Sequence, residues 1–166
     1  MKRPTLPFTL LAVVVLMSLH SVPTAAAEEK AGMKKAPADR VVVMYFHRTQ
    51  RCPTCLRMGS YSEEAVVKGF AQQIKDGTVE FHYVDFQDKK NAALTKGYRI
   101  GGPALIVARV ARNKVVEVNN LKEIWTKNRD KKVFLGYVRD HVTAYQKATS
   151  QTALKPESGV SAPKTK

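Results

Sequence analysis

One segment, residues 41–55, restricts the fold of this chain more than any other. It reads VVVMYFHRTQRCPTC, in which six apolar residues are followed by a polar loop and a Cys-Pro-Thr-Cys group. The apolar run has the length of a strand, is rich in β-branched and aromatic residues and alternates little, which predicts a strand buried on both faces. Cys52 and Cys55, the only cysteines, are spaced to meet across one helical turn as a disulfide or a dithiol. The segment therefore predicts a buried strand that leads through a loop to a cysteine pair on a helix.

Pro53 indicates where that helix begins. Proline has no N–H group to leave unsatisfied, and its fixed φ suits the first helical position, so Cys52 is expected at the helix N-terminus. The free backbone N–H groups and the positive end of the helix dipole favour a thiolate there. Cys55, one turn further along, is expected to be more buried and to act as the resolving thiol. Thr54 either tunes the sulfurs through its hydroxyl or is an ordinary residue of the first turn.

Basic and imidazole side chains flank the cysteine pair in the sequence. Arg48, Arg51 and Arg57 are expected to favour the thiolate of Cys52 through their positive charge. His47 leaves two interpretations open: it lines the redox site as a strand-end residue, or it completes a metal site with the two cysteines. A site of this kind suits soft copper better than zinc, and it needs a fourth ligand or an open position. We favour the first interpretation and predict no metal ligands.

The first 27 residues are typical of a secretory signal peptide. Lys2 and Arg3 form a positive start, residues 8–19 an apolar core too short to span a bilayer comfortably, and residues 25–27 a small-residue cleavage site. We therefore expect a periplasmic or extracellular protein, associated with the membrane only if this segment is not cleaved. A lone cysteine pair in an oxidising compartment is typically a disulfide. Because its loop is very small, the pair stabilises the fold little, which favours a redox-active role.

The rest of the chain divides into three parts by composition. We expect a linker over residues 28–38, one domain over residues 39–148 and a disordered tail, rich in Ser, Thr, Pro and Lys, over residues 149–166. The net charge is +14, from 28 Lys and Arg against 14 Asp and Glu. Basic and aromatic residues are not interleaved as in a nucleic-acid-binding surface. The excess is either a solvated basic surface, which we favour, or a surface that attracts anionic envelope surfaces or acidic partners.

Hydrophobic periodicity predicts the order strand, helix, strand, helix, strand, strand, helix. After the first strand we expect a helix over 56–75, a strand over 79–86, a short helix over 88–95, strands over 104–110 and 115–118 with a turn between them, a short helix over 121–126 and a helix over 130–148. Gly59 is expected to interrupt the first helix, with Ser60 and Glu63 as a capping box. Trp125 is expected to hold the last helices on the core. Crossover helices followed by a hairpin predict an α/β fold with a mixed, four-stranded sheet flanked by helices.

A CxxC pair that opens the first helix of this order resembles the thioredoxin fold. The segment YRIGGPALIV, residues 98–107, is similar to the stretch of thioredoxins that carries a cis-proline just before the third strand. The resemblance implies that Pro103 is cis and that the backbone of Gly102 faces the cysteines and binds the extended chain of a substrate. It also implies a thiol–disulfide oxidoreductase whose only redox group is the disulfide, with no bound cofactor. The partner is then a protein dithiol or disulfide.

Two departures from thioredoxins change the expected site. Arg51 stands where thioredoxins carry a tryptophan before the first cysteine, so the rim of the site is basic rather than flat and apolar. No acidic residue lies in residues 41–46, where thioredoxins keep a buried aspartate that handles the proton of the resolving cysteine. We expect His47 or a water molecule to take that role.

A narrower resemblance is carried by the runs YFHRTQRCPTC, YSEEAV and FLGYVRDHV. They look like the thioredoxin-like family labelled nitrophenyl-compound nitroreductase subunit, ArsF type. That resemblance implies an alternative function, as the redox subunit of a system that reduces nitroaromatic compounds and depends on a second reductase subunit. A copper carrier that uses the two cysteines and His47 is the third hypothesis.

Overall fold

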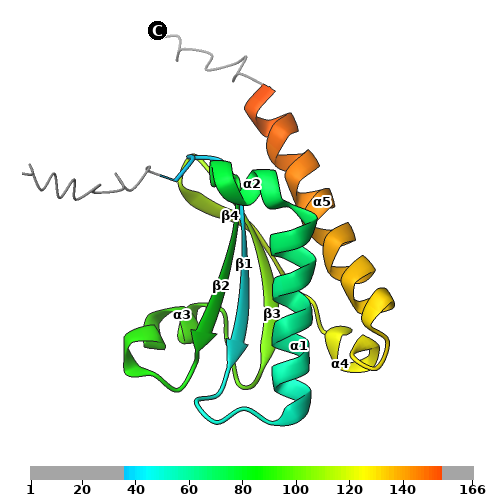
Figure 1. Ribbon diagram of the computed structural model, residues 1–166. Coiled ribbons are helices and arrows are strands. Elements are labelled where there is room, and N and C mark those ends of the chain that lie inside the picture. Colours follow the sequence, from blue (N-terminus) through cyan, green and yellow to red (C-terminus); the bar gives the residue numbers. More distant parts are fainter. Residues whose placement is uncertain (1–35, 155–166) are drawn as a thin grey trace, which may run out of the picture. The chain divides into compact units, whose positions relative to one another are not determined.

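The computed structural model describes residues 36–154 (Figure 1). The elements, in chain order, are β1 (Arg40–His47), α1 (Pro53–Glu63), the π-helical segment η1 (Glu64–Lys68), α2 (Ala71–Asp76), β2 (Val79–Asp85), the 3-10 turn η2 (Lys89–Asn91), α3 (Ala92–Gly97), β3 (Ala104–Ala111), β4 (Lys114–Asn120), α4 (Ile124–Lys127) and α5 (Lys131–Leu154). The predicted signal peptide, most of the predicted linker and residues 155–166 lie outside the described residues. Within the described part, no helix is long and apolar enough to cross a membrane.

The four strands form one mixed sheet in the order β2-β1-β3-β4. Strand β1 runs parallel to β2 and antiparallel to β3, and β3 and β4 form an antiparallel hairpin. This confirms the predicted α/β class and the mixed four-stranded sheet. Arg112 and Asn113 turn the hairpin with φ angles of 52° and 61°, which matches the primed turns whose twist suits a two-residue hairpin.

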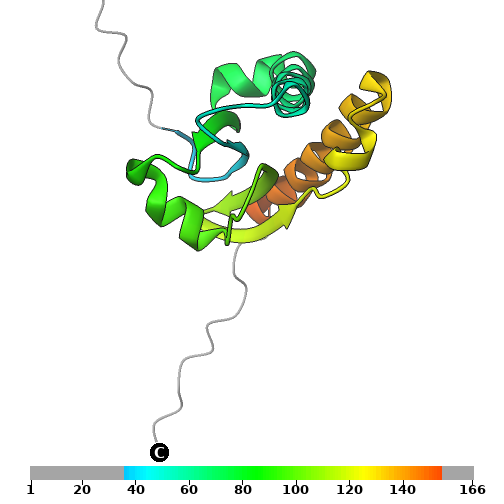
Figure 2. The same cartoon turned by 90° about the horizontal axis from the view of Figure 1, so that it is seen from below.

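Each face of the sheet carries its own hydrophobic cluster. Val43 and Tyr45 of β1 face one cluster, in which α1, η1 and α5 cover the sheet with residues such as Met58 and Phe134. Met44 and its neighbours face the other cluster, which the segment around α3 partly covers. Figure 2 shows α3 on the opposite side of the strands from α1 and α5. Strand β1 is therefore buried on both faces, as its unbroken apolar run predicts.

Gly59 does not interrupt the first helix, contrary to prediction. Helix α1 continues past it to Glu63 and passes directly into η1, and Ser60 lies inside α1, so the predicted capping box is absent. A Cβ atom at position 59 would lie 2.9 Å from a ring carbon of Tyr45 and 3.0 Å from one of Tyr83. The glycine lets α1 approach the sheet closely, and the helix changes geometry only in η1 and at Phe70.

The end of the chain is more helical than its composition predicts. Helix α5 continues to Leu154, so residues 149–154 are not part of a disordered tail. The hydroxyls of Thr149 and Ser150 donate to the carbonyls of Tyr145 and Gln146, one turn earlier. These polar residues therefore find hydrogen-bond partners within the helix.

Trp125 is 47% exposed and does not hold the last helices on the core. The buried residues of that region are instead Leu121 and Ile124, whose exposed fractions are 1% and 0%. The prediction was wrong because the short α4 turns Ile124 toward the core, which leaves the neighbouring Trp125 at the surface.

Candidate redox site

Cys52 and Cys55 occupy the positions that the sequence predicts. Cys52 is the N-cap of α1, with Pro53 at its first turn, and the Cys52 sulfur accepts a hydrogen bond from the backbone N–H of Cys55 at 3.2 Å. Both residues are free cysteines, Cys52 exposed and Cys55 buried. The pair therefore presents one sulfur to the solvent and holds the other beneath it.

The surroundings shift the two thiols in opposite directions. The Cys55 thiol donates a hydrogen bond to the Cys52 sulfur, and together with the backbone N–H groups of Cys55 and Thr54 it lowers the pKa of Cys52. Burial, followed by the same hydrogen bond, raises the pKa of Cys55. Hydrogen bonds stabilise the thiolate of Cys52, whereas burial disfavours the thiolate of Cys55, so the two pKa values move apart. The surroundings suit Cys52 as a nucleophile and favour the protonated form of Cys55.

The arginines were expected to add to the stabilisation of the Cys52 thiolate, but none is among the causes of its lowered pKa. Arg57 donates to the backbone oxygen of Asn128 at 3.1 Å and to its Oδ1 at 2.9 Å. Arg51 donates to His47 Nε2 at 2.6 Å and lies 4.9 Å from the centre of the Tyr83 ring. Arg48 is exposed. Two of the three guanidinium groups therefore connect parts of the structure, and the thiolate depends on the helix and on Cys55.

His47 ends β1 as a buried residue, 7% exposed. Its Nδ1 donates to the carbonyl of Arg48 at 2.9 Å, while its Nε2 accepts from Arg51. Both ring nitrogens are thus engaged within the protein. Residues 36–154 contain no group of three or more His, Cys, Asp and Glu side chains arranged to hold a metal ion. The geometry does not favour the hypothesis of a metal site built from the two cysteines and His47.

Tyr45 is the site residue that the sequence analysis missed. Its hydroxyl donates to the backbone oxygen of Cys55 at 2.8 Å, and its side chain is fully buried. Burial, with a smaller contribution from the two cysteines, raises the pKa of Tyr45. The hydroxyl is therefore not ionised near neutral pH, and as a donor it holds the Cys55 backbone. Tyr45 points to the same face as Val43, toward the helix that carries Gly59, and this pattern could have identified it.

The ring of Tyr83 connects the loop before Cys52 to the sheet. The Tyr83 ring packs edge-on against Tyr45 and His47, with centroid distances of 6.0 and 5.9 Å. Its hydroxyl donates to Glu63 at 3.1 Å, and burial followed by this contact raises the pKa of Tyr83 to about 12. Since Arg51 covers the same ring, the residue immediately before Cys52 is held by contacts from β1 and β2.

The predicted substrate loop reaches the correct end of the sheet, but its proline is not cis. Ala104 pairs with Phe46 across β1 and β3, so Gly102 and Pro103 lie just beyond the strand end that leads to the cysteine loop. No peptide bond in residues 36–154 is cis. Trans is the favoured isomer before proline, by about 0.5–1 kcal/mol.

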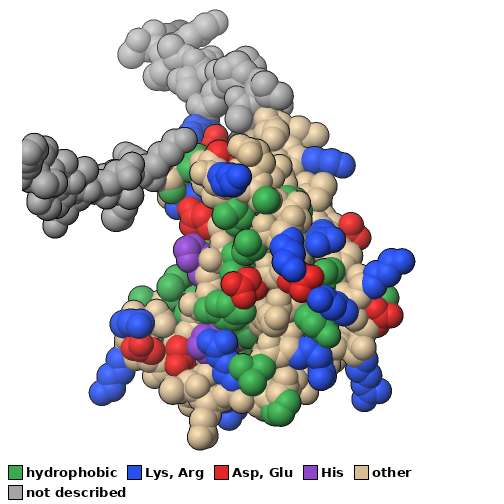
Figure 3. All heavy atoms as spheres, viewed as in Figure 1, with side chains coloured by type: hydrophobic (Ala, Val, Ile, Leu, Met, Phe, Trp, Pro, Cys, Tyr) green, Lys and Arg blue, Asp and Glu red, His purple; other side chains and the backbone are tan. Residues whose placement is uncertain are grey.

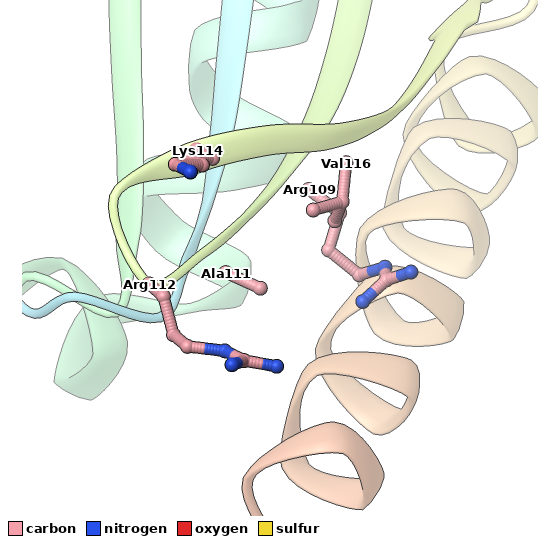
Figure 4. Close-up of a pocket in the computed structure, with 5 residues that line it drawn as sticks. All are labelled: Arg109, Ala111, Arg112, Lys114 and Val116. Carbon is pink, nitrogen blue, oxygen red and sulfur yellow. The ribbon is translucent and has the colours of Figure 1, made fainter. Parts of the chain in front are cut away.

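Basic side chains occur at both ends of the sheet. A hollow of about 160 Å³ beside the cysteine end is lined by residues 99–104 with Asn120, Lys122 and Trp125. A second hollow, of about 320 Å³, lies at the hairpin end, where Figure 4 shows Arg109 and Arg112 extending toward the space beside α5. On the face seen in Figure 3, Lys and Arg side chains are spread out, with Asp and Glu among them. This distribution fits a solvated basic surface.

Comparison with known proteins gives no family for the chain. No protein-family model matches it, and no curated protein matches it. The narrower resemblance to a nitroreductase subunit therefore receives no support from relatives. The mixed sheet and the CxxC pair at the start of α1 are compatible with a thioredoxin-like fold and with a redox role.

Proposed function

We propose that this protein is a thiol–disulfide oxidoreductase that works through Cys52 and Cys55. The observation that carries the proposal is the asymmetry of the pair. Cys52 is exposed with a lowered pKa, and Cys55 is buried one turn away with a raised pKa. A purely structural pair needs no such difference, whereas exchange needs one accessible thiolate and one protected thiol.

In the reducing direction, the Cys52 thiolate attacks one sulfur of a partner disulfide. The partner S–S bond breaks, its second sulfur leaves as a thiolate that takes up a proton, and a mixed disulfide with Cys52 forms. Cys55 then loses its proton to water and attacks the Cys52 sulfur, which releases the partner as a thiol. Two electrons pass from the protein to the partner, and a Cys52–Cys55 disulfide remains. The reverse sequence oxidises a partner dithiol.

Side chains around the two cysteines support these exchange steps, and the proposed steps use no bound cofactor. The Tyr45 hydroxyl holds the Cys55 backbone, and the contacts of Arg51 with His47 and Tyr83 hold the residue before Cys52. Gly102 and Pro103 lie at the same end of the sheet and are the proposed contact for the partner backbone. The signal-like first 27 residues support export, and the proposed partners are then protein dithiols or disulfides of the periplasm or extracellular space. No contact within residues 36–154 favours the nitroaromatic or copper alternatives.

The direct test is a redox titration of the full chain in glutathione buffers, with free thiols counted by alkylation and mass spectrometry after metal removal. We expect one transition in which two thiols disappear together. A variant with Cys52→Ser should lose the transition and serves as the control. A folded protein that keeps two thiols, or two oxidised sulfurs, across the whole range would contradict the proposal.

A further inference from the structure

The hollow of about 160 Å³ at the cysteine end has the character of a recognition cleft. It is lined by residues 99–104, which include Gly101 and Gly102, and by Asn120, Lys122 and Trp125. Added Cβ atoms at the two glycines would meet nothing within 4 Å. An extended polypeptide can therefore approach this backbone closely.

Topology places this cleft at the same end of the sheet as the cysteine pair. Strand β3 begins at the end of the sheet where β1 finishes, and β4 leads back to the same end and into α4 (Figure 1). The backbone oxygen of Trp125 accepts a hydrogen bond from Asn128, and Asn128 in turn accepts from Arg57 of α1. The wall of the cleft is thus tied to the helix that carries both cysteines.

The charges that line the cleft are positive. Arg99 and Lys122 are both exposed, and no carboxylate lines the hollow. Neither cation forms an ion pair with an acidic side chain of residues 36–154. Glu123, the acidic residue nearest Lys122 in sequence, pairs with Lys127 at 3.0 Å. Arg99 also adopts φ of 54°, an uncommon backbone conformation for a residue other than glycine.

Trp125 adds an exposed aromatic surface to these charges. Its side chain is 47% exposed, although the neighbouring Ile124 is fully buried. A tryptophan ring supplies a large contact area at a low cost in side-chain entropy and is enriched where proteins bind partners. A groove with accessible backbone, one exposed ring and two cations fits an extended chain that carries carboxylates.

We infer that this cleft selects partners whose reactive cysteine is flanked by Asp or Glu in an extended segment. This inference rests on the proposed exchange activity and specifies its substrate class. Arg99 and Lys122 pair with the acidic side chains, Trp125 covers the adjacent part of the segment, and the partner sulfur is presented to Cys52. The net charge of +14 adds attraction at longer range. A nucleic acid offers similar charge but no sulfur for exchange.

The test uses three synthetic peptides that differ only in the two residues beside a single cysteine: Asp-Asp, Asn-Asn or Lys-Lys. Each cysteine is carried as a 2-pyridyl disulfide. Cys52 attacks the peptide sulfur, and 2-thiopyridone leaves with the electron pair of the broken bond and a proton. Cys55 then releases the peptide as a thiol, so the protein supplies both electrons. The rate of thiopyridone release by the reduced full chain is divided by the rate with 2-mercaptoethanol, which corrects for each peptide's own reactivity.

We expect the Asp-Asp peptide to react fastest and the Lys-Lys peptide slowest, with a spread of about tenfold at low ionic strength. Added salt should reduce the spread. The double variant Arg99→Glu/Lys122→Glu should reverse the order. The matched control, Lys75→Glu/Lys114→Glu, changes the net charge equally but lies at the other end of the sheet, and it should keep the order.

Each other outcome identifies what fails. Equal corrected rates for the three peptides would overturn the cleft inference while leaving the exchange activity intact. A control double variant that reverses the order as well would also overturn it, because general attraction would then explain the preference. No thiopyridone release from any peptide, by a protein with two free thiols, would overturn the proposed function together with the inference.

Discussion

The two ends of the sheet are both basic, but they use their charges differently. At the hairpin end, Arg109 pairs with Glu117 at 3.0 Å. At the cysteine end, Arg99 and Lys122 line a cleft and form no ion pair with an acidic side chain of residues 36–154. Strand β3 separates the two ends by roughly 23 Å at 3.3 Å per residue. The net charge alone therefore does not locate a function; the ion pairs formed by the fold indicate which cations face a partner.

The largest difference in activity between the two ends of the sheet should come from replacing the cysteines. Cys52→Ser should abolish exchange, because no other thiolate is exposed at the site. Cys55→Ser should leave the first step intact and trap mixed disulfides through Cys52. Both results are read from insulin reduction and from non-reducing gels of the protein with an oxidised partner.

The corresponding control changes the hairpin end, with Lys114→Ala. It should keep exchange within about twofold, as surface substitutions usually change little. If Lys114→Ala lost as much activity as Cys52→Ser, the hairpin end would belong to the active site.

Gly59→Ala should lower stability by about 1–3 kcal/mol, because the added methyl group meets the buried Tyr45 ring at 2.9 Å. Gly136→Ala is the matched control, since its Cβ meets nothing within 4 Å, and helix propensity should make it more stable by up to about 1 kcal/mol. Urea denaturation followed by circular dichroism measures both. If the two alanine variants gain stability alike, α1 does not need the close approach to β1.

The two thiols should also differ in reaction with iodoacetamide. Because the pKa of Cys52 is lowered and that of Cys55 is raised, Cys52 should be alkylated first, and at neutral pH by at least about tenfold. As the pH rises, the advantage should shrink, since Cys55 begins to ionise while Cys52 is already a thiolate. Peptide mapping by mass spectrometry across a pH series measures this. Equal rates for the two thiols at every pH would remove the basis for assigning their roles.

Tyr45→Phe should have the smallest effect, about 1 kcal/mol of stability, from loss of the hydrogen bond to the Cys55 backbone. It should also shift the redox midpoint, because the Cys55 backbone is no longer held. Tyr98→Phe, on the other face of the sheet, is the control for loss of a partly buried hydroxyl. If both variants leave the midpoint unchanged, Tyr45 supports the fold only and does not position the cysteine.

Much of the fold follows from local sequence patterns. The apolar run of residues 41–46, the Cys-Pro-Thr-Cys group and the Arg112–Asn113 turn each determine their own backbone through hydrophobicity, the fixed φ of proline or turn geometry. The order of these elements then predicts the mixed sheet. The place of Cys52 at the start of α1 also follows, and free N–H groups surround a sulfur there whatever else packs nearby.

Tertiary contacts decided the rest. Taken alone, Gly59 predicts a helix break. In the structure it lies against Tyr45 instead, because α1 packs on β1. The arginines near Cys52 were expected to act on its thiolate, but Arg51 and Arg57 found other partners in His47, Tyr83 and Asn128. Trp125 is exposed because α4 turns Ile124 toward the core instead. Local patterns set backbone conformation, whereas the partner of a side chain depends on which distant segments the fold brings together.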